Sequence, residues 1–294
     1  MPMTDISRRA AVAVAALLVV LPVIHRGGWL MGALVAALAM LGTREFCLLA
    51  RRMDIRPFTR TAMAIAAALV VAATAEPFFT GFAPLALTIL MGATIVLPVA
   101  AVRARGVAEK PLASVCSTLT AALCVGGGLC FAVLLRHLPD AGVAVRAPGP
   151  LEGPLLLLFP LAVTWVGDIA AYFAGGLWGH RRLFPVVSPG KTLEGTIAGI
   201  LAAGATGLFF ATAASEPFVL LGVGPSWLVG IALLIGAGGL AGDLAVSLLK
   251  REAGVKDTGS MLPGHGGVLD RLDAVLVTLP LAYAALQLAA SVSP

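Results

Sequence analysis

The chain has 294 residues, of which 59% are hydrophobic and only 12% are charged, and its mean hydropathy is +0.99. An ordinary soluble domain carries about 25% charged residues, so the composition excludes a water-soluble globular protein and indicates an integral membrane protein. Long continuous apolar runs argue against a membrane β-barrel, whose strands alternate in polarity. The net charge is +5, but the basic residues are scattered between apolar segments. We therefore expect membrane lipid or phosphate as the anionic partner, and no nucleic acid.

Apolar runs of roughly 20 residues, the length that a helix needs to cross the hydrocarbon core, predict nine transmembrane helices. In chain order they are expected near residues 8–25, 28–44, 61–80, 83–102, 113–135, 152–177, 192–214, 226–249 and 269–290. A cleaved signal peptide is the alternative for the first run, but no small-residue cleavage site follows it. The predicted fold class is an all-α polytopic membrane protein.

The distribution of Lys and Arg predicts the topology, because these residues collect in cytoplasmic loops. Under the nine-helix topology, only three of the 20 Lys and Arg residues lie on the outer side of the membrane, namely Arg26, Arg136 and Arg146. The others lie on the cytoplasmic side. This distribution predicts a cytoplasmic N-terminus. An active site in the later loops would then face the cytoplasm, and the protein is expected in a bacterial inner membrane. The basic segment 44–60 is expected along the inner membrane surface.

The organisation of the chain is expected to be uneven. Residues 1–150 are predicted to form a transmembrane scaffold, whereas residues 151–294 hold the charged motifs and are predicted to be the catalytic region. Glycines at GxxxG spacing and the run Gly126–Gly128 are interpreted as sites of close helix packing. The GxxxG pairs are Gly195 with Gly199 and Gly238 with Gly242.

Carboxylates within apolar runs are costly and mark functional candidates. Asp168 and Asp243 are of this kind, and Asp243, Ser247 and Lys250 share one stripe of a predicted helix. Asp270 and Asp273 share a face at the start of the last predicted helix. Converging carboxylates suggest a hard divalent cation such as Mg²⁺, although these two would also complement a helix dipole.

Two loops offer donors for phosphate. The loop between the last two predicted helices contains PGHGG together with Lys250, Arg251, Lys256 and His265. A second loop, HRRLFPVVSPGKTLEG, lacks the P-loop spacing but contributes further donors, namely Arg181, Arg182, Ser188, Lys191 and Thr192. These residues predict cation-assisted handling of a phosphorylated substrate at the membrane. They leave kinase, phosphatase, nucleotidyltransferase and transporter open.

The run SLLKREAGVKDTGSMLPGHGGVLDRLD, 247–273, closely resembles the C-terminal signature of the CDP-diacylglycerol synthase family, also called phosphatidate cytidylyltransferases. The upstream stretch GDIAAYFAGGLWGHRRLFPVVSPGKTLEG, 167–195, is similar to a second motif of that family. Gly190 departs from it, because members often have a second Lys there. The resemblance is strong over about 165–275 and only compositional before residue 150.

The resemblance implies a homodimeric, Mg²⁺-dependent membrane enzyme that transfers CMP from CTP to phosphatidic acid and releases pyrophosphate. The number of cations stays open. By carry-over, the catalytic residues are Asp243, Lys250, Lys256, His265 and Asp270. The metal ligands are Asp243, Ser247, Asp270 and Asp273. The residues implied in substrate binding are Ser188, Lys191, Thr192, Arg251, Asp257, Gly266, Gly267 and Arg271.

Three alternatives compete with this interpretation. A cation-coupled transporter would account for Asp168 and Asp243, but it leaves the charged loops unexplained and predicts inverted repeats that the sequence does not show. A CTP-dependent enzyme that acts on another lipid, such as a polyprenol kinase or an archaeal-type lipid cytidylyltransferase, would use similar headgroup chemistry. A scaffold protein has no use for carboxylates at such cost.

Overall fold

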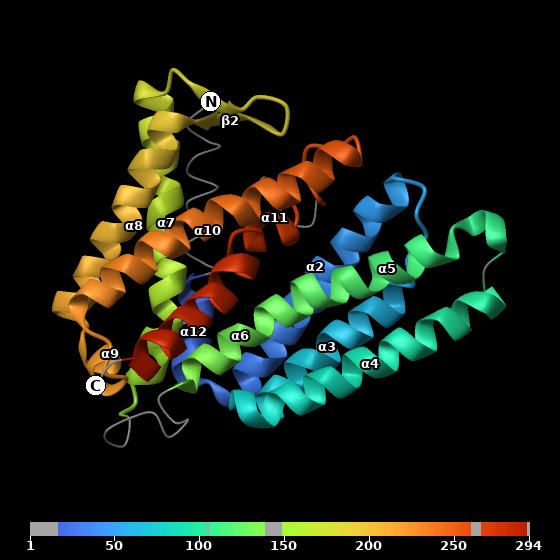
Figure 1. The fold of residues 1–294 in the computed structure, drawn as a ribbon, viewed down its shortest axis with the longest axis horizontal. Helices are drawn as coiled ribbons and strands as arrows, with labels where there is room; N and C mark the ends of the chain where they lie inside the picture. Colours follow the sequence, from blue (N-terminus) through green and yellow to red (C-terminus); the bar gives the residue numbers. More distant parts are fainter. Residues whose placement is uncertain (1–16, 105, 139–148, 260–265, 293–294) are drawn as a thin grey trace. The chain divides into compact units, whose positions relative to one another are not determined.

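The structure, a computed structural model, describes residues 17–104, 106–138, 149–259 and 266–292 (Figure 1). Helices form most of it. In chain order they are a helical stretch Leu17–Arg26, α2 (Gly28–Arg52), α3 (Thr59–Ala75), α4 (Phe79–Ala104), the 3₁₀ turn η1 (Val107–Glu109), α5 (Pro111–Ala121), the π-helix η2 (Ala122–Gly127), α6 (Gly128–Arg136), α7 (Glu152–Trp178), α8 (Leu193–Ala213), α9 (Glu216–Leu220), α10 (Pro225–Glu252), α11 (Leu269–Leu272) and α12 (Val275–Val292).

Seven helical segments among the described residues are long and apolar enough to cross a membrane. The expectation of an all-α polytopic membrane protein is confirmed at this level. Two further apolar helices, Leu17–Arg26 and Thr59–Ala75, are shorter than the other seven. The count of nine and the side of the N-terminus stay predictions, and the first half of the predicted helix 8–25 lies outside the described residues.

Two local features differ from the sequence-based expectations. Helix α2 continues to Arg52, so the first part of the segment 44–60 extends a membrane helix instead of lying along the surface. The loop before α8 contains a short antiparallel hairpin of β1 (Arg182–Phe184) and β2 (Ser188–Thr192), with Phe184 paired to Ser188. The all-α prediction missed this hairpin because its strands are too short to give a clear alternation of polar and apolar residues.

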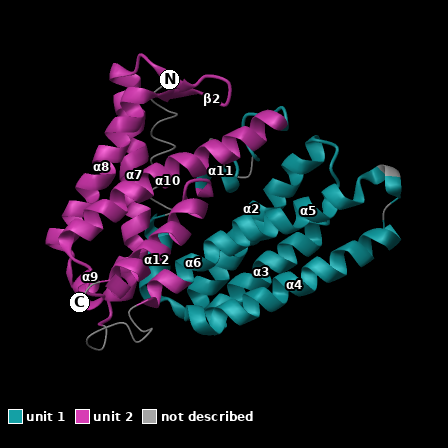
Figure 2. Ribbon diagram, in the orientation of Figure 1, with its two compact units in different colours: residues 1–133, 253–271 teal, residues 134–252, 272–294 magenta. Residues whose placement is uncertain are grey.

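The chain divides into two compact units, coloured separately in Figure 2. Unit 1 contains residues 1–133 and 253–271, and unit 2 contains residues 134–252 and 272–294. The segment 253–271, which carries much of the C-terminal signature, therefore groups with the N-terminal helices. The sequence-based division into a scaffold, residues 1–150, and a catalytic region, residues 151–294, stays a prediction.

Small side chains permit close helix packing in unit 1, where α2, α3, α4 and α5 lie side by side (Figure 1). Cys47, Ala62 and Ala121 are fully buried together. A Cβ atom at Gly126 would lie 2.6 Å from the Cα atom of Ala66, so only glycine permits this approach of η2 to α3. The glycine run therefore packs helices, as expected, and it coincides with a π-helical turn.

In unit 2, α7 packs against α8, and α10 packs against both α8 and α12. A Cβ at Gly195 would lie 2.7 Å from the carbonyl oxygen of Ala171, and one at Gly199 would lie 3.0 Å from that of Gly167. This GxxxG pair is therefore a packing surface, as predicted. The close approach of α7 and α8 brings the hairpin that precedes α8 to the end of α7.

Candidate active site

The clearest polar cluster of unit 2 surrounds Asp243, in the second half of α10. Lys191, at the end of β2, forms an ion pair in which its Nζ atom lies 2.5 Å from Oδ2 of Asp243. Ser247, one helical turn after Asp243, donates a hydrogen bond to Oδ1 over 3.3 Å. The predicted stripe on α10 is confirmed for this pair, and both carboxylate oxygens of Asp243 have a polar neighbour.

Asp273, in the turn between α11 and α12, completes this cluster. Its carboxyl group lies close enough to Asp243 for the two charges to interact, and its Oδ1 atom accepts a hydrogen bond from the backbone N–H of Ala274 over 2.8 Å. The approach depends on Gly242, because a Cβ there would lie 2.5 Å from the carbonyl oxygen of Asp273. Two carboxylates this close repel one another unless a proton or a cation lies with them.

Two further charges of unit 2 face this pair of carboxylates. Asp168 on α7 lies within electrostatic range of both Asp243 and Lys191. Lys250, two turns after Asp243 on α10, lies within electrostatic range of Asp273. The cluster therefore combines three carboxylates from membrane-spanning segments with the ammonium groups of Lys191 and Lys250. Residues that are costly to place there are functional candidates.

The oxygen atoms of this cluster fit a hard divalent cation. Within the described ranges, no group of three or more His, Cys, Asp and Glu side chains is arranged to hold a metal ion. Mg²⁺ commonly takes one or two carboxylates and completes its shell with water and substrate phosphate oxygens. Asp243 and Asp273, with the hydroxyl of Ser247 beside them, form a donor set of this kind.

The second motif loop of unit 2 is held in place by hydrogen bonds from backbone N–H groups to two of its side chains. Glu194 accepts hydrogen bonds from the N–H groups of His180 and Arg181, at 3.1 and 3.3 Å. Thr192 caps α8 by accepting a hydrogen bond from the N–H of Gly195. These contacts connect the ends of the hairpin to α8, and Lys191 on β2 of the same hairpin pairs with Asp243.

Arg251 connects α10 to the same loop. Its Nε atom donates a hydrogen bond to the carbonyl oxygen of Val187 over 3.1 Å. Val187 lies in the turn between β1 and β2, close to Ser188. The structure therefore gives Arg251 and Thr192 positioning contacts, and their predicted contacts with substrate stay predictions, as does that of Ser188.

The C-terminal signature loop of unit 1 closes on Asp270. The Oδ2 atom of Asp270 accepts hydrogen bonds from the N–H groups of Thr258 at 2.8 Å and of Gly267 at 3.0 Å, and it lies 3.0 Å from the hydroxyl oxygen of Thr258. Gly266 has a φ of +76°, a conformation that favours glycine. Asp270 thus joins the two ends of the loop.

A second carboxylate, which the sequence pattern does not mark as functional, holds this loop. Glu45 on α2 is only 2% exposed. It accepts hydrogen bonds from the hydroxyl of Thr258 at 2.9 Å and from the N–H groups of Val268 and Leu269 at 3.0 and 2.8 Å. A Cβ at Gly267 would collide with the Glu45 carboxylate. The only sequence signal was an acidic residue at the end of a long apolar run.

The remaining predicted residues are distributed between the two units. Asp270, Gly266 and Gly267 belong to unit 1, whereas Asp243 and Asp273 belong to unit 2. In unit 1, the side chains of Lys256, Asp257 and Arg271 are exposed at the surface. His265 lies outside the described residues. The predicted catalytic and substrate-binding roles of these residues stay predictions.

Comparison with known proteins shows which family this chain resembles. Residues 7–289 match the model of the cytidylyltransferase family. A Synechocystis protein named phosphatidate cytidylyltransferase is 34% identical over 279 residues, which cover 87% of this chain and 88% of that protein. Proteins of the same name from Haemophilus influenzae and Staphylococcus aureus strain COL are 40% and 39% identical over 134 and 130 residues.

The two shorter alignments cover 45% and 44% of this chain and 45% and 48% of the respective relatives. The family match, by contrast, includes both units and all the charged motifs described above. On this ground the chain belongs to the cytidylyltransferase family.

Proposed function

We propose that this protein is a phosphatidate cytidylyltransferase, which transfers CMP from CTP to phosphatidic acid and releases pyrophosphate. The observation that carries the proposal is the cluster of Asp243, Lys191, Ser247 and Asp273 within a hydrophobic helical unit. It supplies the oxygen and ammonium groups that the phosphates of a nucleotide and a lipid require. The names of the relatives support the choice of substrates.

The reaction is an in-line displacement. A phosphate oxygen of phosphatidic acid attacks the α-phosphorus of CTP, a new P–O bond forms, and the bond to the β-phosphate breaks to release pyrophosphate. The attacking phosphate monoester is already anionic at neutral pH, so no strong general base is required. Catalysis then depends on positioning and on charge neutralisation.

Lys191 and Lys250 are the cations of unit 2 best placed to neutralise phosphate charge, because both lie beside the acidic pair. Asp243, Asp273 and Ser247 would hold Mg²⁺, which when bound supplies positive charge to the phosphate oxygens. The family resemblance also implies Asp270 of unit 1 as a metal ligand, and this role stays a prediction beside its contacts in the loop. His265, Lys256 and Asp257 are proposed to contact the nucleotide.

The cellular setting is proposed from charge and from the relatives. The positive-inside pattern and the bacterial relatives support a bacterial inner membrane, with the active site facing the cytoplasm. The homodimer implied by the family resemblance is part of the same proposal.

The proposal is tested by pyrophosphate release from the purified protein in detergent. We expect release with CTP, phosphatidic acid and Mg²⁺ together, no release when either substrate is left out, and loss of release in excess EDTA that added Mg²⁺ reverses. ATP in place of CTP is the control for nucleotide choice. Release with another lipid but not with phosphatidic acid would contradict the proposed substrate.

A further inference from the structure

A basic pocket in unit 1 has no assigned role in the reaction described above. It has a volume of about 630 Å³ and is lined by Arg44, Arg51 and Arg52 of α2 together with Thr258 and Gly259 of the signature loop. All its lining residues belong to unit 1. We propose that this basic pocket binds the phosphate monoester headgroup of the lipid substrate, an inference that rests on the proposed function.

The three arginines belong to one face of α2. Positions 44, 51 and 52 are separated by seven and eight residues, a spacing that places them on the same side of a helix. The carboxylate that also borders the pocket, Glu45, is engaged by three hydrogen-bond donors of the loop. Positive charge therefore dominates the pocket.

The guanidinium groups are available for an anion. Arg51 donates a hydrogen bond to the hydroxyl of Thr59, which is uncharged. Within the described part of the chain, neither Arg44 nor Arg52 makes an ion pair, and both are exposed. Guanidinium groups bind phosphate oxygens in pairs of parallel hydrogen bonds, so two or three of them around one cavity suit a phosphate with two negative charges.

The position of the pocket along α2 favours a lipid as the source of that phosphate. The 25 residues of α2 extend for about 37 Å, which exceeds the roughly 30 Å of a hydrocarbon core. The last turn, with Arg51 and Arg52, therefore reaches the level of lipid headgroups. The backbone of Arg44 lies two turns before Arg51 and Arg52, farther into the membrane. A charged side chain is costly there unless it extends toward a polar site.

A purely topological role would require positive charge at the end of α2, but it would not require a cavity. The pocket is also bordered by the signature loop, directly after Lys256 and Asp257. A headgroup bound there would be held beside the loop that Glu45 and Asp270 fix in place.

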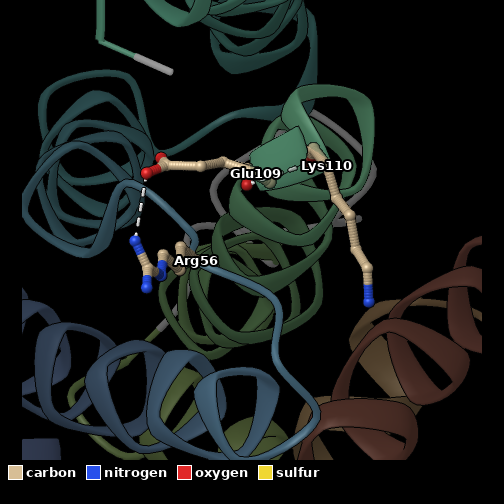
Figure 3. Close-up of polar contacts among 4 residues, drawn as sticks. Arg56, Glu109 and Lys110 are labelled. Atoms are coloured by element: carbon tan, nitrogen blue, oxygen red, sulfur yellow. Dashed lines mark hydrogen bonds and ion pairs between the residues drawn. The ribbon is translucent and has the colours of Figure 1, made fainter. Parts of the chain in front are cut away.

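The chain offers a matched control in Arg56, whose guanidinium group pairs with Glu109 at 3.1 Å instead of lining the pocket (Figure 3).

The test compares the double variant Arg44→Gln/Arg52→Gln with the control Arg56→Gln/Arg60→Gln, which removes the same charge from the same unit. Pyrophosphate release gives KM for phosphatidic acid and for CTP. Binding of a fluorescent short-chain phosphatidic acid is measured without CTP, with phosphatidylglycerol as a singly charged competitor. This second measurement does not depend on turnover, so it judges the pocket even if the wild type releases no pyrophosphate.

We expect the pocket variant to raise KM and Kd for phosphatidic acid by about tenfold or more, since charge-assisted hydrogen bonds are lost, and to leave KM for CTP unchanged. The control should resemble the wild type in all three constants. An increase confined to KM for CTP would assign the pocket to the triphosphate and overturn the lipid proposal. Equal effects in the pocket variant and the control would also overturn it.

Discussion

Replacing Asp243 with Asn is expected to reduce kcat by about 10³-fold, or about 4 kcal/mol, while the protein still folds. The change removes a negative charge that is bonded to Ser247, paired with Lys191 and close to Asp273. An amide can neither neutralise Lys191 nor serve as an anionic ligand for a cation. The measurement is pyrophosphate release at saturating substrates, with thermal unfolding in detergent to confirm folding.

Asp54→Asn is the matched control, because it makes the same isosteric change at an exposed turn residue whose φ is +56°. Asn tolerates that left-handed conformation as well as Asp does, so stability and turnover should both stay at the wild-type level. A folded Asp243→Asn enzyme with turnover within a few-fold of the wild type would remove Asp243 from the catalytic cluster. Asp270 is a poorer choice for this test, since its Oδ2 atom also closes the loop.

Replacing Glu45 with Ala is expected to open the signature loop and to reduce turnover by about 100-fold or more. The change leaves the buried N–H groups of Val268 and Leu269 without their acceptor, and it leaves the hydroxyl of Thr258 with Asp270 in place of Glu45. Each buried unpaired donor costs about 1–3 kcal/mol, which is comparable to the free energy that holds a local segment closed. Hydrogen exchange measures the opening directly, because the N–H groups of Val268 and Leu269 should exchange faster.

Glu45→Gln separates the hydrogen bonds from the charge. It keeps one acceptor oxygen but turns an NH₂ group toward N–H donors, so faster exchange and partial loss of turnover are expected. Glu109→Ala is the control in the same unit, because its ion pair with Arg56 is exposed and contributes little. Wild-type exchange at Val268 and Leu269 in Glu45→Ala would show that Glu45 does not hold the loop.

The helices were largely predictable from the sequence because continuous apolar runs are dictated by the membrane. Residues 152–177 and 192–214 were expected as helices, and α7 and α8 occupy Glu152–Trp178 and Leu193–Ala213. The end of α2 was missed, because its last turns are basic and lie beyond the apolar run. From the sequence alone, the basic residues there predict the start of a surface segment.

The site was predictable only where its residues are close in sequence. The contact of Asp243 with Ser247 follows from their spacing on a helix, and it is present. The ion pair with Lys191 depends on a hairpin that the sequence did not reveal. Glu45 lies 213 residues before Thr258, so nothing local could connect it to the loop that it holds.

Transfer of labelled phosphate to lipid tests the central claim most directly. The purified protein would be given phosphatidic acid, Mg²⁺ and CTP labelled at either the α- or the γ-phosphorus, and the lipid would be extracted into organic solvent. Cytidylyl transfer predicts that the α-label enters the lipid as CDP-diacylglycerol and that the γ-label stays in water as pyrophosphate. The γ-label in the lipid would instead show a kinase, and it would contradict the proposed reaction.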